Sequence, residues 1–421
     1  DPLGMGTLPS DNYYADLYNA DGTYIHWDYD DDDRIGEFPD DLDDMDFAPD
    51  VCVMRIPAST VPELTTAITH IIGYESIPSH TEDWLNTVVF AAVDTFNAEA
   101  HGEMSGIPEG EQYAEMLASD LFVDDQIVRL YETDTYPKDD VCYPETVSQT
   151  VSGGAGYLAF HCHGAPDCFQ LADYACFDHT HCSQMTNADM LPLIYGFACS
   201  TAAFDNEIPG YPYSTGAESM PEHFLLNPQG GGIAFIGSTR VAFASGFGHD
   251  QHMTGSGAIE YWFWNARKNG ILTSGQMFAQ AQIDYLRHVG VLSVYDYITI
   301  MEHNGFGDPS VTFGGWFTEP RLNVYGTAIE NISSGGSCIL PGDDVNLTLR
   351  VINEGIPVGT PVFELVSDHP DVSIVQGTAS IETLPRISSA EVGPFRMEIE
   401  ASCPDSILVP LELVVSDGAS E

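Results

Sequence analysis

Short apolar runs alternate with amphipathic stretches over the first three quarters of the chain. Residues 110–121 repeat apolar side chains at helical spacing. Buried strands separated by helices indicate an α/β fold with a mostly parallel sheet. In such sheets, functional residues lie just beyond the carboxyl ends of the strands. The apolar runs of strand length are residues 86–94, 127–131, 156–161, 193–198 and 232–237.

The pattern changes near residue 320. Apolar and polar residues then alternate in short stretches between turn residues, without helical periodicity. This alternation is typical of antiparallel strands with one buried face. We therefore expect an Ig-like all-β sandwich over residues 320–421, with Cys338 and Cys403 as a candidate disulfide. Its predicted strands are residues 346–352, 361–366, 372–375, 392–399 and 407–415.

The charge balance excludes two classes of partner. The chain has 64 Asp+Glu against 12 Lys+Arg, which gives a formal net charge of −52 at pH 7. Such a surface has too few cations for sequence-general binding of nucleic acid or for docking to an anionic membrane. Hydrophobic residues make up 43% and aromatic residues 11% of the chain, which argues for a folded protein. No apolar run approaches the roughly 18 residues of a membrane-spanning helix.

The cysteines favour an oxidising, extracellular or cell-surface location. There are nine of them, an odd number, so at least one is left over from intramolecular pairing. A mixed Cys/His set between residues 163 and 199 could bind zinc, but its spacing matches no standard zinc finger. Disulfides are therefore favoured over zinc in this segment. The set comprises Cys168, Cys176, His179, His181 and Cys182.

Two predicted strand ends carry candidates for a nucleophile and a base. One ends in His161, Cys162, His163 and Gly164, and the other ends in Cys199. Adjacent parallel strand ends can bring a thiol and an imidazole together, which activates the thiol. A glycine after the histidine lets a backbone N–H approach a developing oxyanion. From spacing alone, a buried cysteine and a capped histidine explain the pattern equally well.

Seven blocks of residues occur in a fixed order along the chain. They are 10–17, 28–37, 46–57, 163–164, 198–205, 231–238 and 307–309. Together they resemble the gingipain-type (C25-like) family of cysteine peptidases, which shares the caspase-like fold with caspases and legumains. The similarity extends from residue 10 to about residue 313. The resemblance implies a caspase-like α/β fold and a cysteine endopeptidase.

The resemblance also implies roles for single residues. Cys199 would be the nucleophile and His163 the acid/base, with the N–H groups of Gly164 and Cys199 as the oxyanion hole. Asp94 follows a predicted strand where the family places an acidic residue that orients the histidine, although a helix N-cap explains it equally well. Two further residues are expected to face away or to pack beneath the site: His161 and Cys162.

The pocket for P1, the substrate residue whose carbonyl is attacked, is less clearly implied. Family members that select a basic P1 residue use an acidic side chain, which we expect in the loop 103–111, with Glu109 as the candidate. The pocket wall would receive residues from the end of the strand 232–237. Arg240 there could instead prefer an acidic P1 residue, or it could form an ion pair elsewhere. The wall candidates are Ser238, Thr239, Arg240 and Phe243.

Residues 28–37 hold five aspartates and one glutamate. Asp28, Asp30 and Asp32 have the alternate spacing with which calcium loops direct oxygens at one ion, and Glu37 is a fourth candidate ligand. A solvated acidic loop is the alternative. Because the family binds calcium, the resemblance implies a structural calcium ion. We expect the stability of the protein to rise with added calcium or salt.

The resemblance divides the chain into three parts. Residues 1–80 would end the first catalytic subdomain, residues 81–319 would form the caspase-like catalytic subdomain, and residues 320–421 the sandwich. The opening strands of the first subdomain are not in this sequence, which predicts a non-covalently bound N-terminal fragment of the same precursor. The predicted function is a secreted cysteine endopeptidase that acts on proteins or peptides. The alternative is a catalytically silent or transpeptidase-like calcium-binding cell-surface protein of the same fold.

Overall fold

The chain forms two compact units, residues 1–315 and residues 316–421. The boundary lies within a few residues of the predicted change of pattern near residue 320. The computed structural model describes residues 7–19, 21–42, 45–77, 82–95, 108–205, 218–243, 254–314, 319–333, 339–385, 388–404 and 409–417. Cys338, one half of the predicted disulfide, lies outside these residues.

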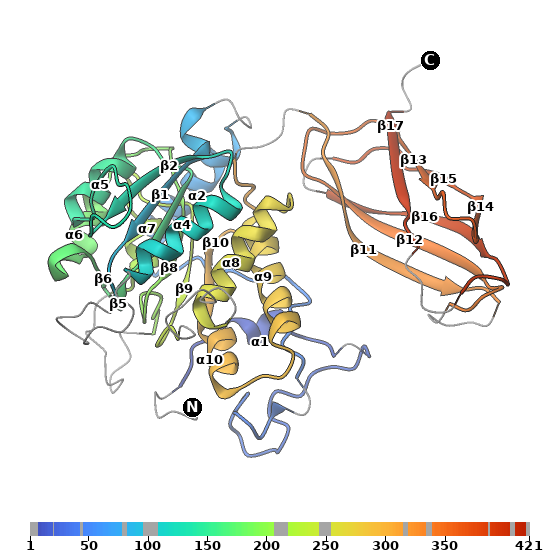
Figure 1. Ribbon diagram of the computed structural model, residues 1–421, viewed down its shortest axis with the longest axis horizontal. Coiled ribbons are helices and arrows are strands. Elements are labelled where there is room, and N and C mark those ends of the chain that lie inside the picture. Colours follow the sequence, from blue (N-terminus) through green and yellow to red (C-terminus); the bar gives the residue numbers. More distant parts are fainter. Residues whose placement is uncertain are drawn as a thin grey trace. The chain divides into compact units, whose positions relative to one another are not determined.

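A seven-stranded sheet forms the centre of the first unit, in the order β10-β9-β8-β4-β1-β2-β3 (Figure 1). Neighbouring strands pair in parallel except β10, which is antiparallel to β9. The mostly parallel α/β sheet predicted from the sequence is thus confirmed. The strands are β1 (Thr87–Ala92), β2 (Gln126–Tyr131), β3 (Asp140–Val141), β4 (Tyr157–His161), β8 (Leu193–Phe197), β9 (Ala234–Ser238) and β10 (His303–Gly307).

Helices cover one face of this sheet and bury a large aromatic core. Tyr113 and Trp264 from two of the helices pack in one cluster with Phe90 of β1 and Tyr157 of β4. The strands are apolar on both sides, as expected for a parallel sheet with two covered faces. The helices on this face are α4 (Glu109–Leu121), α8 (Gly255–Lys268), α9 (Ser274–Val289) and α10 (Val294–Glu302).

Three shorter helices contribute to the core on the opposite face. Val147 and Phe224 pack there with Phe160 of β4 and Phe235 of β9. Residues 160 and 235 belong to this core, whereas their neighbours along β4 and β9 belong to the first core. Each of these strands therefore contributes side chains to the cores on both faces of the sheet. The helices are α5 (Pro144–Ser152), α6 (His179–Ser183) and α7 (Met220–Leu225).

The first 80 residues share the core of the first unit. Trp27, Phe47 and Tyr74 belong to the same cluster as the side chains of α4 and α8. The longest helix in this region begins at a capping box, in which Thr60 and Glu63 each bond the other's backbone N–H. The helices in this region are α1 (Asn12–Ala15) and α2 (Val61–Glu75), and the 3₁₀ turn η2 (Asp83–Asn86) follows, directly before β1.

A small antiparallel sheet follows β4 directly. Its strands run in the order β5 (His163–Ala165), β6 (Cys168–Gln170) and β7 (Cys176–Phe177), with the 3₁₀ turn η3 (Ala172–Tyr174) between the last two. The sheet begins at His163, so it fixes the backbone of one candidate catalytic residue.

The second unit is a β-sandwich of two antiparallel sheets, β11-β12-β16-β14 and β15-β13-β17. Val345, Phe363 and Phe395 from both sheets share one core. The all-β texture predicted from residue 320 onward is confirmed, and its Ig-like character stays a prediction. The strands are β11 (Leu322–Asn331), β12 (Asp344–Asn353), β13 (Pro361–Val366), β14 (Val372–Gln376), β15 (Thr378–Ser380), β16 (Ser388–Ile399) and β17 (Glu412–Asp417).

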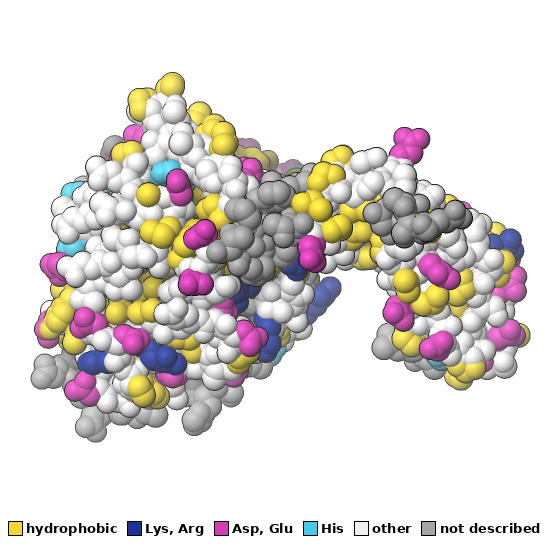
Figure 2. Space-filling model, turned by 90° about the horizontal axis from the view of Figure 1, so that it is seen from above, with side chains coloured by type: hydrophobic (Ala, Val, Ile, Leu, Met, Phe, Trp, Pro, Cys, Tyr) yellow, Lys and Arg dark blue, Asp and Glu magenta, His cyan; other side chains and the backbone are white. Residues whose placement is uncertain are grey.

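Acidic side chains are spread over the face of the molecule that Figure 2 shows. Figure 2 shows Asp and Glu side chains scattered over the visible face of the molecule, with few Lys and Arg side chains among them. This distribution agrees with the formal net charge of −52. A dispersed charge of one sign keeps proteins soluble and makes their stability sensitive to salt.

Candidate active site

The register of two central strands brings the predicted catalytic pair together. β4 and β8 are parallel, and the last residues of the two strands, His161 and Phe197, are register partners. Two residues onward along each chain stand His163, the first residue of β5, and Cys199, in the turn that follows β8. The N–H of Cys162 still donates to the carbonyl of Phe197 at 3.4 Å, so the pairing extends past the strand ends.

His163 and Cys199 line one pocket with a volume of about 360 Å³. The pocket lies at the carboxyl ends of the strands, where functional residues of parallel α/β sheets are found. Most of its wall is apolar or aromatic, with a few polar groups among them. The lining residues are Thr95, Glu109, Gly110, Tyr113, His161, Cys162, His163, Phe197, Ala198, Cys199, Val241, Ala242 and Phe243.

A sharp turn presents Cys199 to the pocket. Ser200, the next residue, has a φ of 59°, which is uncommon for a residue with a side chain. Two hydrogen bonds fix this turn to the end of β9. The N–H of Ser200 donates to the carbonyl of Arg240 at 2.6 Å, and that of Ala202 donates to the carbonyl of Ser238 at 3.0 Å. The turn is therefore held in place by the neighbouring strand.

The thiol of Cys199 is protonated in its resting environment. Burial raises the pKa of Cys199 to about 11, and the buried carboxyl of Glu302 acts in the same direction, against a hydrogen bond from the N–H of Ala242. At neutral pH only a small fraction of the sulfur is thiolate. The thiol therefore needs a base that removes its proton while it attacks.

The backbone of Thr95 orients His163. The Nε2 atom of His163 lies 2.8 Å from the carbonyl oxygen of Thr95. A carbonyl only accepts, so Nε2 carries the proton of the neutral ring and Nδ1 is the basic nitrogen. The sequence assigned this orienting role to Asp94. The bond that the structure shows at Nε2 comes from the next residue along the chain, Thr95, whose backbone carbonyl accepts it.

Asp94 belongs instead to a group of carboxyls beside the pocket. Its side chain is hydrogen-bonded to that of Glu109, and its backbone N–H donates to Oε2 of Glu132 at 3.0 Å. Burial raises the pKa of Asp94 to about 6, and the charges of Glu109 and Glu132 add to the shift. A hydrogen bond between two carboxyls requires a proton on one of them, which agrees with the raised pKa.

Gly164 lies directly against the cysteine loop. A Cβ atom at this position would meet the carbonyl oxygen of Cys199 at 2.5 Å and the Cβ of Ala198 at 2.8 Å. Only glycine allows this approach. The backbone of Gly164 and that of Cys199 are therefore neighbours, as an oxyanion hole shared between them requires.

The structure separates the predicted P1 residues into two groups. Glu109 and Phe243 line the pocket, whereas Ser238, Thr239 and Arg240 are not among its lining residues in the described part of the chain. Arg240 is 2% exposed and forms an ion pair with Asp205, at 2.9 and 2.6 Å. The hydroxyl of Thr239 donates to the carbonyl of Pro9. Three wall assignments are thus corrected: the wall after β9 comes from Val241, Ala242 and Phe243, and Arg240 is not available to an acidic P1 residue.

His161 and Cys162 are both buried and both contribute to the lining of the pocket. Cys162 also belongs to the core cluster on the opposite face of the sheet. His161 packs beneath the pocket, and its Nε2 lies 3.0 Å from Oε1 of Glu260. Glu260 was not predicted. The signal that could have found it is an acidic residue within the apolar stripe of α8, four residues before Trp264.

The acidic loop brings together carboxylates that match the predicted set only in part. Oxygens of Asp28, Asp30 and Asp41 lie within 4.8 Å of one another. The predicted ligand Glu37 is turned toward Arg34 instead, with a guanidinium nitrogen at 2.8 Å. Asp32 likewise faces that side chain, at 3.9 Å. The sequence missed Asp41 because it lies outside the acidic run, although it is fully buried.

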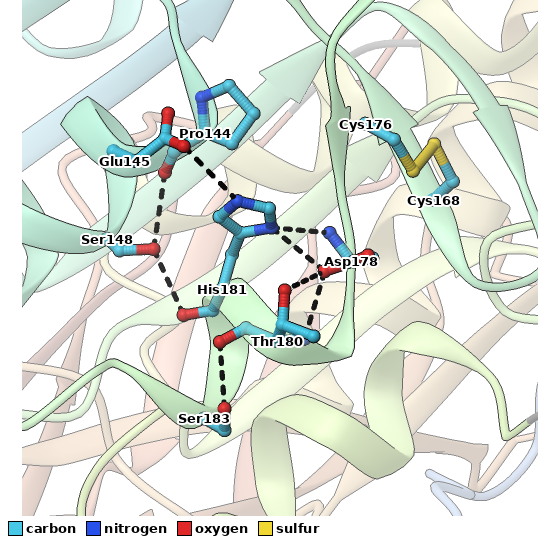
Figure 3. A network of polar contacts seen from close by, with 9 residues as sticks. All are labelled: Pro144, Glu145, Ser148, Cys168, Cys176, Asp178, Thr180, His181 and Ser183. Carbon is cyan, nitrogen blue, oxygen red and sulfur yellow. Dashed lines mark hydrogen bonds and ion pairs between the residues drawn. A yellow bond between two sulfur atoms is a disulfide. The ribbon is translucent and has the colours of Figure 1, made fainter.

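The Cys/His segment is tied by one disulfide, between Cys168 and Cys176 (Figure 3). This bond removes both sulfurs from the zinc ligands considered above. His181 lies close by, with Nδ1 2.9 Å from Oδ1 of Asp178, in a capping box that begins α6. Cys182 is buried in the core. The segment is therefore held by a disulfide and by helix capping.

Fold and pocket together define a parallel α/β protein with a thiol and an imidazole at neighbouring strand ends. The chain belongs to peptidase family C25, whose family model matches residues 3–313. Membership in this family of cysteine peptidases confirms the resemblance drawn from the sequence.

Individual relatives are distant. An uncharacterized protein of Archaeoglobus fulgidus is 26% identical over 208 residues, which are 47% of this chain and 48% of that protein. Gingipain R2 of Porphyromonas gingivalis is 24% identical over 317 residues, 75% of this chain and 39% of that protein. The chain thus spans less than half the length of these curated relatives.

Solved structures include the Arg-specific cysteine proteinase gingipain R, with 18% identity, a TM-score of 0.48, and coverage of 87% of this chain and 73% of that one. A structure described only as a protease has 14% identity, a TM-score of 0.49, and coverage of 87% of this chain and 75% of that one.

In the described part of this chain, no helix combines the length and the apolarity that crossing a bilayer requires.

Proposed function

We propose that this protein is a cysteine endopeptidase in which Cys199 attacks the substrate carbonyl and His163 transfers the proton. The observation that carries the proposal is that both residues line one pocket, just beyond the ends of the neighbouring strands β4 and β8. Membership in peptidase family C25 supports it. A thiol and an imidazole in one pocket are the two groups that thioester chemistry needs.

The reaction follows from the protonation states of the two groups. As the sulfur of Cys199 bonds to the carbonyl carbon, its proton passes to the imidazole of His163. The oxyanion that forms accepts hydrogen bonds from the N–H groups of Gly164 and Cys199. The imidazolium then protonates the leaving amine, the C–N bond breaks, and a thioester remains. Water, deprotonated by His163, hydrolyses the thioester and releases the acid and the thiol.

Mutation of the pair tests this proposal. Wild-type protein should hydrolyse a mixture of peptides, and Cys199→Ala and His163→Ala should each abolish turnover. Cys162→Ala is the matched control, because this neighbouring thiol belongs to the apolar core cluster, although the residue also lines the pocket. Undiminished hydrolysis by Cys199→Ala would refute the mechanism, and a folded wild type that hydrolyses none of the peptides would favour a catalytically silent protein.

We propose that the pocket accepts a basic P1 residue. Glu109 supplies a carboxylate that is 5% exposed and lines the pocket. Tyr113, Phe197 and Phe243 provide aromatic surface for the aliphatic stem of a lysine or arginine side chain. Peptides that differ only at P1 test this specificity: Arg and Lys should exceed Asp and norleucine in kcat/KM, and Glu109→Gln should reduce the advantage. A preference for Asp would contradict it.

We propose a structural calcium ion in the acidic loop, held by Asp28, Asp30 and Asp41. Their oxygens lie within 4.8 Å of one another, and carboxylates are the ligands that calcium prefers. Asp41 already accepts hydrogen bonds from the N–H groups of Tyr29 and Glu37, which fix its carboxylate. Calcium would tie the loop to the core through this buried residue. Isothermal titration with calcium tests the site, and absence of binding would refute it.

We also propose that a further polypeptide, from the same precursor, covers the outer side of α2. Four apolar side chains on one stripe of this helix are exposed: Val61 at 78%, Leu64 at 41%, Ile68 at 43% and Ile72 at 61%. A contiguous apolar stripe of this kind is typical of an interaction surface. Purification from the native source tests the idea. A second polypeptide should copurify and be released by Ile68→Lys, whereas a stable single polypeptide would contradict it.

We also propose that this protein acts outside the cell or at the cell surface. The Cys168–Cys176 disulfide supports this location, because disulfides persist in oxidising compartments. Thiol trapping in intact cells tests it: the pair should be oxidised and accessible to an external protease. A reduced pair in the cytosolic fraction would contradict the location.

A further inference from the structure

A buried arginine holds the turn that carries Cys199 at two points. Arg240 lies just beyond the end of β9 and is 2% exposed. Its backbone carbonyl accepts a hydrogen bond from the N–H of Ser200 at 2.6 Å. Its guanidinium group binds both carboxylate oxygens of Asp205, with nitrogen–oxygen distances of 2.9 and 2.6 Å. One residue therefore binds both the beginning and the end of the segment that follows the nucleophile.

The first of these bonds bears directly on the geometry at Cys199. The N–H of Ser200 belongs to the same planar peptide group as the carbonyl of Cys199, so its hydrogen bond to Arg240 fixes that whole group. The carbonyl of Cys199 is the one that a Cβ atom on Gly164 would approach to 2.5 Å. The N–H of Ala242 bonds to the sulfur itself. The segment 240–242 therefore orients both the backbone and the thiol of residue 199.

The side chain of Arg240 fixes the segment 240–242 in the protein. Besides the carboxylate, it binds the N-terminal part of the chain, because its Nε donates to the carbonyl oxygen of Thr7 at 3.0 Å. The hydroxyl of the neighbouring Thr239 donates to the carbonyl oxygen of Pro9, also at 3.0 Å. A guanidinium is a planar fork of five N–H donors, so it can bind a carboxylate with two parallel bonds and a carbonyl with a third. This fork joins three segments of the chain at the end of β9.

We infer that Arg240 is a positioning residue for Cys199, because its fork holds the segment that orients the thiol and the peptide group after it. Arg240 is not among the described residues that line the pocket, so it acts through the turn rather than on the substrate. The inference rests on the proposed function in taking Cys199 as the nucleophile. A misplacement of about 1 Å between reacting groups costs on the order of 100-fold in rate. A loosened turn should therefore lower kcat more than it changes KM.

The main variant removes the ion pair without leaving a buried charge alone. Arg240→Met/Asp205→Asn removes both charges and keeps most of the volume, whereas loss of one partner leaves an unpaired buried charge and can prevent folding. Arg267→Met/Asp125→Asn is the matched control. Arg267 also binds both oxygens of a buried aspartate, at 3.0 and 2.7 Å, and neither residue of this pair lines the pocket. Arg240→Lys is a second variant, which keeps the charge beside Asp205 but loses the planar fork.

The amide of Ser200 reports on the turn and requires no peptide hydrolysis. A cysteine is followed by a serine twice in the sequence, at residues 182–183 and 199–200. Labelling of cysteine with ¹³C at the carbonyl and of serine with ¹⁵N therefore gives two amide signals, which Ser183→Ala assigns. Hydrogen exchange at Ser200 should be roughly tenfold or more faster in the double variant than in wild type or the control, because the bond to Arg240 opens more often. Exchange at Ser183, in α6, should be unchanged.

Steady-state peptide hydrolysis by the folded proteins separates positioning from a merely structural role. In the double variant, kcat should fall roughly tenfold or more with a smaller change in KM, and in Arg240→Lys it should fall roughly threefold or more. The control should keep the kcat of wild type even if its Tm falls as far. Wild-type kcat in the double variant or in Arg240→Lys, equal loss of kcat in the control, or unchanged exchange at Ser200 would overturn the inference. If wild type hydrolyses no peptide but exchange at Ser200 still depends on the pair, the proposed function fails and the hold of Arg240 on the turn stands.

Discussion

Replacement of Gly164 by alanine tests how closely the histidine strand and the cysteine loop must approach. A Cβ atom there would lie 2.5 Å from the carbonyl oxygen of Cys199 and 2.7 Å from Cγ2 of Thr201. Ordinary van der Waals contact begins near 3.4 Å, so β5 and the cysteine loop must separate by roughly 0.9 Å. A misplacement of about 1 Å between reacting groups costs on the order of 100-fold in rate.

The expected result is a fall of roughly 100-fold in kcat/KM for a peptide substrate, with a loss of about 1–3 kcal/mol in the free energy of unfolding from overpacking. Steady-state hydrolysis and urea unfolding measure the two effects. Gly359→Ala is the control, because a Cβ atom at Gly359 meets no atom within 4 Å. A Gly164→Ala protein with wild-type kcat/KM would refute the close approach of the two backbones as a requirement for catalysis.

Four further predictions concern charge and cross-links. Alkylation of Cys199 by iodoacetamide should accelerate about tenfold per pH unit from neutral pH upward, because burial raises its pKa to about 11, and a flat profile would contradict this environment. Replacement of Cys168 and Cys176 together by serine removes a cross-link between residues 8 apart and should cost roughly 2–3 kcal/mol of unfolding free energy in a calorimetric or urea assay. Burial raises the pKa of Asp94 to about 6 in the folded protein, so its stabilising contribution is complete below the ordinary value of 3.8 and is lost as the pH rises through about 6. Asp94→Asn should therefore flatten the pH dependence of the free energy of unfolding over this window, and an unchanged dependence would count against the prediction. A calcium chelator should lower the Tm of wild type but not that of Asp41→Asn, and equal shifts in both proteins would argue against this ligand.

The sequence predicted the fold well where each element follows from local pattern. The apolar runs that end near His161 and Phe197 are strands β4 and β8, and the periodic stretch 110–121 is helix α4 to within one residue. Continuous apolar runs and helical periodicity reflect burial directly, so the elements predicted from them are present in the structure. Strand order is a property of long-range pairing, which local patterns do not report, and the sequence analysis predicted none.

The candidate site was predictable where it depends on strand ends and not where it depends on loop backbone or distant partners. Their positions at two strand ends made His163 and Cys199 candidates, and the family resemblance gave their roles. The contact of His163 with the carbonyl of Thr95 could not be predicted, since every residue type has a backbone carbonyl. The assignment of Arg240 to the pocket failed because its partner, Asp205, lies 35 residues away in the sequence.

The same limit explains the residues that sequence reasoning missed. Asp41 joins the acidic loop from outside the aspartate run, and Glu260 reaches His161 from a helix 99 residues further on. Both are fully buried carboxyls, which a sequence pattern cannot distinguish from surface acids in so acidic a chain. Only the folded structure shows what each one pairs with.

The central claim is that Cys199 is the nucleophile and that His163 activates it. A peptidyl acyloxymethyl ketone with arginine at P1, followed by peptide mapping in a mass spectrometer, tests this claim most directly. One adduct on Cys199 is expected in wild type and in Cys162→Ala, with labelling lost in His163→Ala. An adduct on another cysteine, or equal labelling of Cys199 in His163→Ala, would contradict the account.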